Sequence, residues 1–558
     1  MKHTSRLRTL CLAALLAVSL QVVVAASGGE AVSEQAVPDR GPWAAIPRAA
    51  IPAAAEHPAS MAIREEEGRW LVSEKALQEY GLYKADAKKG TYWLRLPPAK
   101  DGSVLWKDMQ AALRLPARQS DGETSLNIRR IYRTMGLSLT WEEGKRELMR
   151  PVSPTRLAPT LRPLGDSHRA AEANTKTDNK KEKKKDKKSR KKQERKMGLV
   201  LFWDPLMQGD ENLPSLDTAQ PVMSPCAFRL TDKGVALRHD DFAMLADAYA
   251  AKGYAMWPLI DNNFDPALTH AVLSDDKLQD TMIKELIGYA LLYDFKGYNI
   301  DFENINYADK DKLTAFVGRL SRACRAYGLK LSMDVTPISN SMNWSRVYDR
   351  AALAPHLDYL MLMAYDQFGR TSSVAGPVAS YPWVEKAVQN VTAIVPAEKV
   401  VLGMPLYMRL WYETTEERDL PLDINEWPPV AGTEGAAEKD AGAEALTPSK
   451  QNEAKGKTAF KEAKSKKPVL LVRTLPMSAS GLLLEKYKDY VTWNDELGLY
   501  YMDLPLTTGR VQVWFEDEKS LTEKAKLITK YNLGGASFWR KGFEAPHFWQ
   551  SFAPQELT

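Results

Sequence analysis

The sequence has little cysteine and little histidine, with 3 and 7 residues among 558. Cys11 falls in an N-terminal apolar run, which leaves Cys226 and Cys324. Two cysteines cannot build the disulfide framework that stabilises many small exported domains, and their positions leave open whether they pair. With so few of both residue types, and no His cluster in 61–150, we expect neither a metal site nor a cofactor.

A second long apolar run is also missing. The first, LCLAALLAVSLQVVVAA, follows three basic residues and ends in small residues, which is typical of an export signal. We predict a signal peptide over 1–26 with cleavage near Ala25 or Ala26. The run is short for a membrane span, so no stable span is expected after cleavage, and a retained anchor is the alternative. The chain is therefore predicted to be exported, either secreted or bound to a bacterial cell envelope.

The basic character of the chain is confined to one segment. The net charge is +5, yet residues 176–196 carry 13 Lys and Arg against 4 Asp and Glu, which leaves the remainder near −4. No aromatic residue interleaves these charges, so base stacking is absent and nucleic-acid binding is not expected. We predict a disordered, solvated linker over 153–197 that contacts anionic envelope polymers.

Two further segments precede this linker. Residues 27–55 are rich in Ala and Pro and are predicted to be a tether. Residues 56–152 are predicted to form a small duplicated α+β module, because 68–97 and 122–151 share one layout of a helix-like segment, a strand, a Gly turn and a strand. This layout resembles the copper amine oxidase N-terminal-like domain, a stalk module of exported bacterial proteins, although the missing His cluster means that no copper is implied.

From residue 198 onward, apolar strands alternate with amphipathic helices such as 275–294 and 308–328. Eight such strands predict a (β/α)₈ TIM barrel over 198–553. A small α+β insertion is predicted over 412–510, with a disordered Ala/Glu/Lys-rich loop at 431–467. The eight strands are expected at 198–203, 221–228, 254–260, 297–303, 329–337, 357–366, 399–411 and 534–540.

Residues 296–304, KGYNIDFEN, alternate polar and apolar side chains. A strand with this pattern presents Asn299, Asp301 and Glu303 on one face, which in isolation indicates a half-exposed antiparallel strand. In a parallel barrel both faces are covered, so these carboxyls must lie inside or at the C-terminal mouth, where their burial is costly. Barrel enzymes keep their catalytic groups at this mouth, so we expect Asp301 and Glu303 to be catalytic.

Four separated motifs resemble glycoside hydrolase family 18, whose members include chitinases and other β-N-acetylglucosaminidases. KGYNIDFE is similar to the D-x-x-D-x-D-x-E signature, and LMLMAYD to the Met-x-Tyr-Asp strand. GMPLYMRLW is similar to the Gly-x-Pro-x-Tyr-x-Arg-x-Trp strand, and GGASFW to the last strand. The resemblance covers roughly residues 198–553 and points toward bacterial cell-wall and spore-cortex glycosylases.

The resemblance implies a retaining mechanism in which the 2-acetamido oxygen of the substrate attacks the anomeric carbon and forms an oxazolinium. Glu303 would be the acid and then the base, Asp301 would orient the acetamide N–H, and Tyr365 would bond the acetamide carbonyl. The tyrosine could instead be a core aromatic, as could Trp539, and Arg409 could simply pair with an acid. The implied substrate-binding residues are Trp539, Asp366, Met363, Tyr407, Arg409 and Asn299.

Two positions depart from the family pattern. Lys296 and Asn299 stand where the signature has acids, upstream of the catalytic pair, so they are expected to tune the site rather than abolish it. The Ser-x-Gly-Gly of the third strand is also missing, since this strand reads PLIDNNFD. Asp261 or Asn262 is expected to take over part of that support.

We therefore predict an exported glycoside hydrolase that cleaves β-1,4 bonds in polymers of N-acetylglucosamine, with peptidoglycan favoured over chitin. The alternative is a non-catalytic glycan-binding or envelope scaffold protein on the same barrel. A scaffold would be expected to lose the acid, whereas Glu303, Asp301 and Tyr365 are all present.

Overall fold

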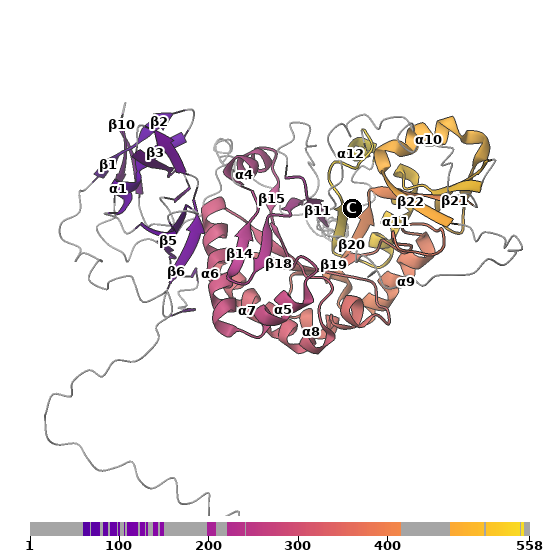
Figure 1. Cartoon of the computed structure of the whole chain (residues 1–558), viewed down its shortest axis with the longest axis horizontal. Helices are drawn as coiled ribbons and strands as arrows, with labels where there is room; N and C mark the ends of the chain where they lie inside the picture. The colour runs from indigo at the N-terminus through magenta and orange to yellow at the C-terminus, as the bar shows by residue number, and fades with distance from the viewer. Residues whose placement is uncertain are drawn as a thin grey trace, which may run out of the picture. The chain divides into compact units, whose positions relative to one another are not determined.

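The computed structural model describes residues 60–149 with short gaps, then 198–207, 220–239, 242–414, 469–506, 509–546 and 548–551. The predicted signal peptide, both linkers and the loop at 431–467 lie outside these residues. The described chain contains a TIM-barrel-like α/β fold, in which a curled sheet is flanked by helices (Figure 1). None of its helices combines the length and the apolarity that a membrane crossing requires.

Most strands of the main sheet run parallel and are buried on both faces. At one edge, β13 (Phe228–Thr231) pairs parallel with β16 and antiparallel with β14 (Gly234–Leu237). Every residue of β11 and β20 is buried, because helices cover one face and packed side chains the other. The strands pair in the order β17, β18, β19, β20, β26, β11 and β12. β15 and β16 are separated by only two residues. β15 pairs with β12 and β16 pairs with β17, which are the two end strands of this series. The bounds are Leu199–Asp204 (β11), Gln220–Pro225 (β12), Ala255–Met256 (β15), Leu259–Asp261 (β16), Gly297–Asp301 (β17), Lys330–Val335 (β18), Tyr359–Met363 (β19), Val400–Pro405 (β20) and Gly535–Trp539 (β26).

The two helices predicted at 275–294 and 308–328 are confirmed. Asp275 caps α6 by accepting from two backbone N–H groups, and α7 ends at Gly328, whose φ of 72° is the left-handed conformation that glycine adopts at low cost. The helices of this domain are α4 (Phe242–Ala251), α5 (Pro266–Leu273), α6 (Asp276–Tyr293), α7 (Lys310–Tyr327), α8 (Arg350–Leu353), α9 (Tyr381–Thr392), α11 (Glu518–Lys530) and α12 (Phe548–Ser551).

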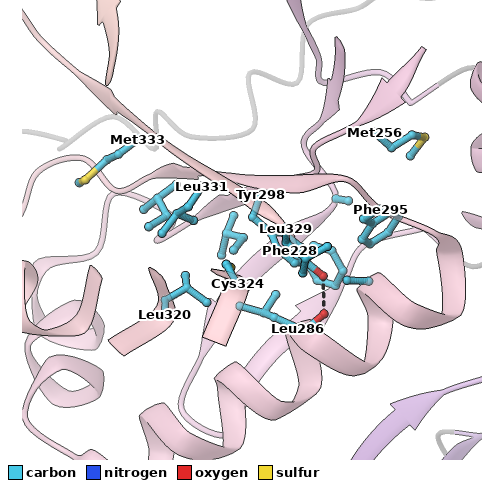
Figure 2. Close-up of a cluster of buried hydrophobic side chains, with 14 of the residues drawn as sticks. Phe228, Met256, Leu286, Phe295, Tyr298, Leu320, Cys324, Leu329, Leu331 and Met333 are labelled. Atoms are coloured by element: carbon cyan, nitrogen blue, oxygen red, sulfur yellow. Dashed lines mark hydrogen bonds between the residues drawn. The ribbon is translucent and has the colours of Figure 1, made fainter. Parts of the chain in front are cut away.

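A hydrophobic core fills the space between the sheet and its helices. Figure 2 shows Tyr298 and Phe228 facing Leu286, and the Tyr298 hydroxyl donates to the Leu286 carbonyl oxygen at 2.5 Å. Each such side chain contributes about 1.5–3 kcal/mol by leaving water. Cys226 and Cys324 are both buried and free, so they form no disulfide with each other.

The stretch predicted as one strand at 399–411 is instead two strands in two sheets, and that prediction is wrong. β20 pairs with β26 as far as Pro405, which has no N–H with which to continue a ladder. After Leu406 the chain enters β21, the second strand of a five-stranded antiparallel sheet of order β22-β21-β25-β24-β23. These strands are β21 (Tyr407–Thr414), β22 (Val469–Pro476), β23 (Val491–Asn494), β24 (Leu499–Leu506) and β25 (Gly509–Trp514), with α10 (Ser480–Lys486) between β22 and β23. The boundaries predicted at 412–510 stay a prediction.

The N-terminal module contains three small antiparallel sheets. In the first predicted copy, β3 (Arg69–Ser73) and α1 (Glu74–Gln78) precede the hairpin of β4 (Tyr83–Asp86) and β5 (Thr91–Arg95). In the second copy, β8 (Glu123–Asn127) precedes the hairpin of β9 (Ser138–Glu142) and β10 (Lys145–Met149). β3 and β8 pair with each other. The remaining strands are β1 (Ser60–Ala62), β2 (Arg64–Glu66), β6 (Gln110–Arg114) and β7 (Ala117–Ser120).

Candidate active site

Glu303 lies two residues beyond the end of β17, at the C-terminal mouth of the parallel strands. Asn262 holds its backbone from both sides: the Asn262 Oδ1 accepts from the Glu303 N–H at 3.0 Å, and its Nδ2 donates to the Glu303 carbonyl at 2.8 Å. Asn262 is fully buried, and its Nδ2 also donates to Thr269 at 2.8 Å. Of the two supports predicted from sequence, Asn262 therefore fixes the position of Glu303.

Asp261, the other predicted support, has an electrostatic role. It pairs in register with Asp301 across β16 and β17, and it forms ion pairs with Arg238 and, at 3.4 Å, with Arg229. Burial and the charge of Asp261 raise the pKa of Asp301 to about 7, against the opposing effect of Arg238. Asp301 therefore titrates near neutral pH.

Glu303 has a pKa raised well above its usual value. Desolvation is the largest cause, followed by the negative charges of Asp301 and Asp366. Like charges in a poorly solvated site cannot all be ionised together, so a proton is retained. Glu303 therefore holds its proton to a higher pH than an exposed glutamate does, while it remains accessible at the mouth.

Tyr365 and Asp366 follow the end of β19. Burial, and then the charge of Asp334, raise the pKa of Tyr365, so its hydroxyl stays a hydrogen-bond donor. Asp366 accepts from the Tyr407 hydroxyl and, at 2.6 Å, from Arg409 Nη2. The ion pair considered for Arg409 is therefore formed, and it joins β21 of the antiparallel sheet to the mouth.

Aromatic rings form the floor beneath these polar groups. The indole of Trp203, on β11, lies 6.4 Å from the ring of Tyr365 and 6.1 Å from that of Trp539 at the end of β26. Tyr365 in turn lies edge-on to Tyr407, with centroids 6.3 Å apart. Met363 is buried at the end of β19. Rings from the ends of β19 and β26 thus converge on Trp203, and Tyr407 of β21 extends the cluster through Tyr365.

Asp334 was missed by the sequence interpretation. It lies on β18, is 1% exposed, and accepts from Asn299 Nδ2 at 2.7 Å. Desolvation, followed by the charge of Asp301, raises the pKa of Asp334 well above its usual value. The signal was present, since LSMDV is an apolar parallel strand with one acid near its C-terminal end.

The two positions that depart from the family signature lie in different surroundings. Asn299 is fully buried, and its amide is bonded to Ser332 at 2.6 Å and to Asp334. Asn299 has no exposed surface in this structure, and its predicted contact with substrate stays a prediction. Lys296 is exposed just before β17 begins, at the end of the strand opposite to Glu303, and pairs with Asp294 at 2.7 Å.

An exposed aromatic pair borders the mouth next to Glu303. The rings of Phe264 and Trp344 are 6.1 Å apart and inclined by 35°. Asn304, which follows Glu303, donates to the Phe264 carbonyl at 3.0 Å. Phe264, Asn304 and Asp366 all have positive φ, and such backbone strain concentrates at functional sites.

Among the described residues, no group of three or more His, Cys, Asp or Glu side chains has the arrangement of a metal site. Of the carboxyls at the mouth, Asp261 and Asp366 are paired with arginines and Asp334 with an amide. Their chemistry is that of proton transfer in a poorly solvated pocket.

Comparisons with known proteins converge on one family. The model of the glycosyl hydrolases family 18 matches residues 263–543, just over half of the 558 residues. The uncharacterized glycosylase YvbX of Bacillus subtilis is 25% identical over 304 residues, 53% of this chain and 73% of the relative. The cortical fragment-lytic enzyme of Bacillus subtilis is 22% identical over 295 residues, 52% of this chain and 57% of the enzyme.

Solved structures share this fold. One is the C-terminal domain of a chitinase candidate from Desulfitobacterium hafniense DCB-2, with a TM-score of 0.51 and 21% identity, and the match covers 65% of this chain and 100% of that domain.

Proposed function

The chain belongs to family 18 of the glycosyl hydrolases, and we propose that it hydrolyses β-1,4 bonds that follow N-acetylglucosamine in a polysaccharide. The observation that carries the proposal is the state of Glu303. It lies at the mouth of the barrel, is held by Asn262, and has a pKa raised by burial and by two neighbouring acids. It can therefore deliver a proton to a glycosidic oxygen at neutral pH.

The mechanism needs one protein acid, because the substrate supplies the nucleophile. Glu303 protonates the glycosidic oxygen while the acetamido carbonyl oxygen attacks the anomeric carbon, which breaks the glycosidic bond and gives an oxazolinium. The Glu303 carboxylate then takes a proton from water, whose oxygen attacks the same carbon and reopens the ring. The sugar is released with retained configuration, and Glu303 again carries its proton.

Other residues serve the acetamide and the sugar ring. Asp301 accepts from the acetamide N–H, and its negative charge offsets the positive charge of the oxazolinium. The Tyr365 hydroxyl donates to the acetamide oxygen. Trp539 stacks beneath the sugar and Met363 packs beside it. Asp366, Tyr407 and Arg409 form one bonded wall of the subsite.

We favour peptidoglycan as the substrate polymer, and we propose that the enzyme is exported. The names of two relatives, a glycosylase and a cortical fragment-lytic enzyme, support this choice. We further propose that the parallel strands close into a full (β/α)₈ barrel, that 56–152 is a copper amine oxidase N-terminal-like stalk, and that 153–197 contacts anionic envelope polymers.

The direct test incubates the full chain with purified peptidoglycan and, separately, with chitin oligomers, and determines the masses and the anomeric configuration of the products. Peptidoglycan fragments whose new reducing end is N-acetylglucosamine of retained configuration would support the proposal. A thiazoline analogue of the oxazolinium should inhibit tightly. Binding of glycan without turnover, and without inhibition by the thiazoline, would favour the scaffold alternative.

The pH dependence of the rate is expected to be bell-shaped. As pH rises through the raised pKa of Glu303, the acid loses its proton and the rate falls. As pH falls through the pKa of Asp301, near 7, the rate falls because the anion beside the acetamide is neutralised. Initial rates measured across pH should show both limbs, and Asp301→Asn should change the acidic one. A profile without an acidic limb would remove Asp301 from this role.

The exposed pair Phe264 and Trp344 is expected to bind sugar units on the far side of Glu303. Replacing both by Ala should raise KM for long glycans by about tenfold, equivalent to ~1.4 kcal/mol, and should leave kcat for the shortest cleavable substrate nearly unchanged. Tyr490→Ala, which removes another exposed aromatic ring, is the matched control. An equal loss on short and long substrates would contradict the assignment.

A further inference from the structure

Asn299 and Asp334 form a bonded pair inside the barrel. Asn299 Oδ1 accepts from the Ser332 hydroxyl at 2.6 Å, and its Nδ2 donates to Asp334 Oδ2 at 2.7 Å. Asn299 is 0% exposed and Asp334 is 1% exposed, so neither is solvated. The amide on β17 therefore carries no charge, and the buried carboxyl that faces it comes from the neighbouring strand.

The pairing of β17 with β18 brings Asp334 to the level of Asp301. Ile300 pairs with Met333, so the next residue on each strand lies at the same height. Both aspartates retain one buried oxygen, Oδ1, without a hydrogen bond of good geometry in the described residues, and the indole N–H of Trp203 beside Asp334 is likewise unsatisfied. The indole supplies one donor and serves Asp334, so the Asp301 oxygen still lacks a donor, which is costly. A proton on either carboxyl turns it into a donor to the other.

The arginines near the pair form their ion pairs with other carboxylates. Arg229 and Arg238 pair with Asp261, and Arg409 pairs with Asp366. The titratable or charged groups that interact with the two aspartates are Glu303, Asp261, Arg238, Cys226, Tyr348 and Tyr365. Next to these groups lie Asp204, Arg229, Asp366 and Tyr407. Acids outnumber bases, which favours a shared proton.

We propose that Asp334 supplies from β18 the carboxyl that Asn299 lacks on β17, and that it positions Asp301 by sharing one proton with it. The proposal rests on the proposed hydrolysis and adds a positioning residue to it. The proton passes between the two Oδ1 atoms, and no other bond changes. When Asp334 holds it, Asp301 bears a full negative charge beside the acetamide, which stabilises the positive oxazolinium.

The test exchanges the two side chains of the bonded pair. Asp334→Asn leaves an amide at both positions and is expected to lower kcat by about tenfold or more, with little change in KM, and to shift the acidic limb of the pH–rate profile. The double variant Asn299→Asp/Asp334→Asn returns one carboxyl to the pair and should recover most of kcat and the profile. Ser332→Ala, which removes a bond to Asn299 without removing a carboxyl, should keep the shape of the profile.

A readout independent of turnover separates this inference from the proposed function. The infrared carbonyl band of protonated carboxylic acids at neutral pH should lose intensity in Asp334→Asn and regain it in the double variant. If the chain shows no hydrolytic activity but the band is lost and recovered as expected, the proposed function is refuted while the inference of a shared proton stands. An unchanged pH–rate profile and an unchanged band in Asp334→Asn would overturn the inference. A double variant that folds but has a kcat as low as that of Asp334→Asn would also overturn it.

Discussion

Replacing Glu303 by Gln is expected to reduce hydrolysis by roughly 10²–10⁴-fold or more, because a single side chain is both the acid of the first step and the base of the second. The amide has the same shape and can still accept a hydrogen bond, but it cannot deliver a proton. The change also removes an acid from a crowded acidic pocket, so the fold should not be weakened. Turnover of peptidoglycan and the melting temperature measure the two effects.

The choice of substrate sharpens this experiment. An aryl glycoside with an acidic leaving group departs without a proton, so its first step should be affected less by Glu303→Gln than that of the natural glycan. Glu485→Gln, a matched change on the exposed surface of α10, is the control and should retain the parent rate. Retention of even about a tenth of the parent turnover on the glycan would reject Glu303 as the acid.

Much of the candidate site could be predicted because its residues lie at the ends of parallel strands. The carboxyl ends of such strands meet at one edge, so residues far apart in sequence converge there. Tyr365 after β19 and Trp539 at the end of β26 are both within 6.4 Å, by ring centroids, of Trp203. Their positions at the C-terminal ends of two parallel strands were sufficient to predict that they lie close together.

The supporting contacts could not be predicted, because they depend on which strands are neighbours and in which register. Asn262 bonds to a residue 41 positions away, and Asn299 to Asp334, 35 positions away. Nothing in PLIDNNFD indicates that its asparagine, rather than its aspartate, holds Glu303. The burial of Asn299 likewise follows from its two bonded neighbours on β18, which local alternation does not reveal.

The break within 399–411 was hidden by uniform composition. Residues on both sides of Pro405 are apolar and buried, so the hydrophobic pattern continues through the junction. What separates β20 from β21 is hydrogen bonding: the Leu406 N–H donates to the Trp539 carbonyl, and the Leu406 carbonyl accepts from the Met477 N–H. Both partners come from distant segments, and that division is what brings Arg409 to Asp366.

The second large effect is expected for the ion pair of Lys524 and Glu516, which links α11 to the end of β25. Their charged atoms are 2.7 Å apart, and the two side chains are 0% and 1% exposed. Lys524→Met keeps most of the length of the side chain but leaves Glu516 buried without its cation. We expect the free energy of unfolding to fall by about 3–5 kcal/mol, since breaking a buried pair from one side leaves an uncompensated charge.

The loss in Lys524→Met should depend on pH in a defined direction. Desolvation already raises the pKa of Glu516 to about 7, although Lys524 lowers it, so the variant raises it further. When the pKa of a carboxyl is higher in the folded state than in the unfolded state, the free energy of unfolding falls as pH rises above the unfolded-state pKa. Melting temperatures of the variant should therefore approach those of the parent in acid and diverge toward neutral pH. Lys524→Met/Glu516→Gln should recover much of the loss, because Gln retains an acceptor for Ser520 without a charge. A double variant no more stable than the single one would show that packing, and not the unpaired carboxylate, causes the loss.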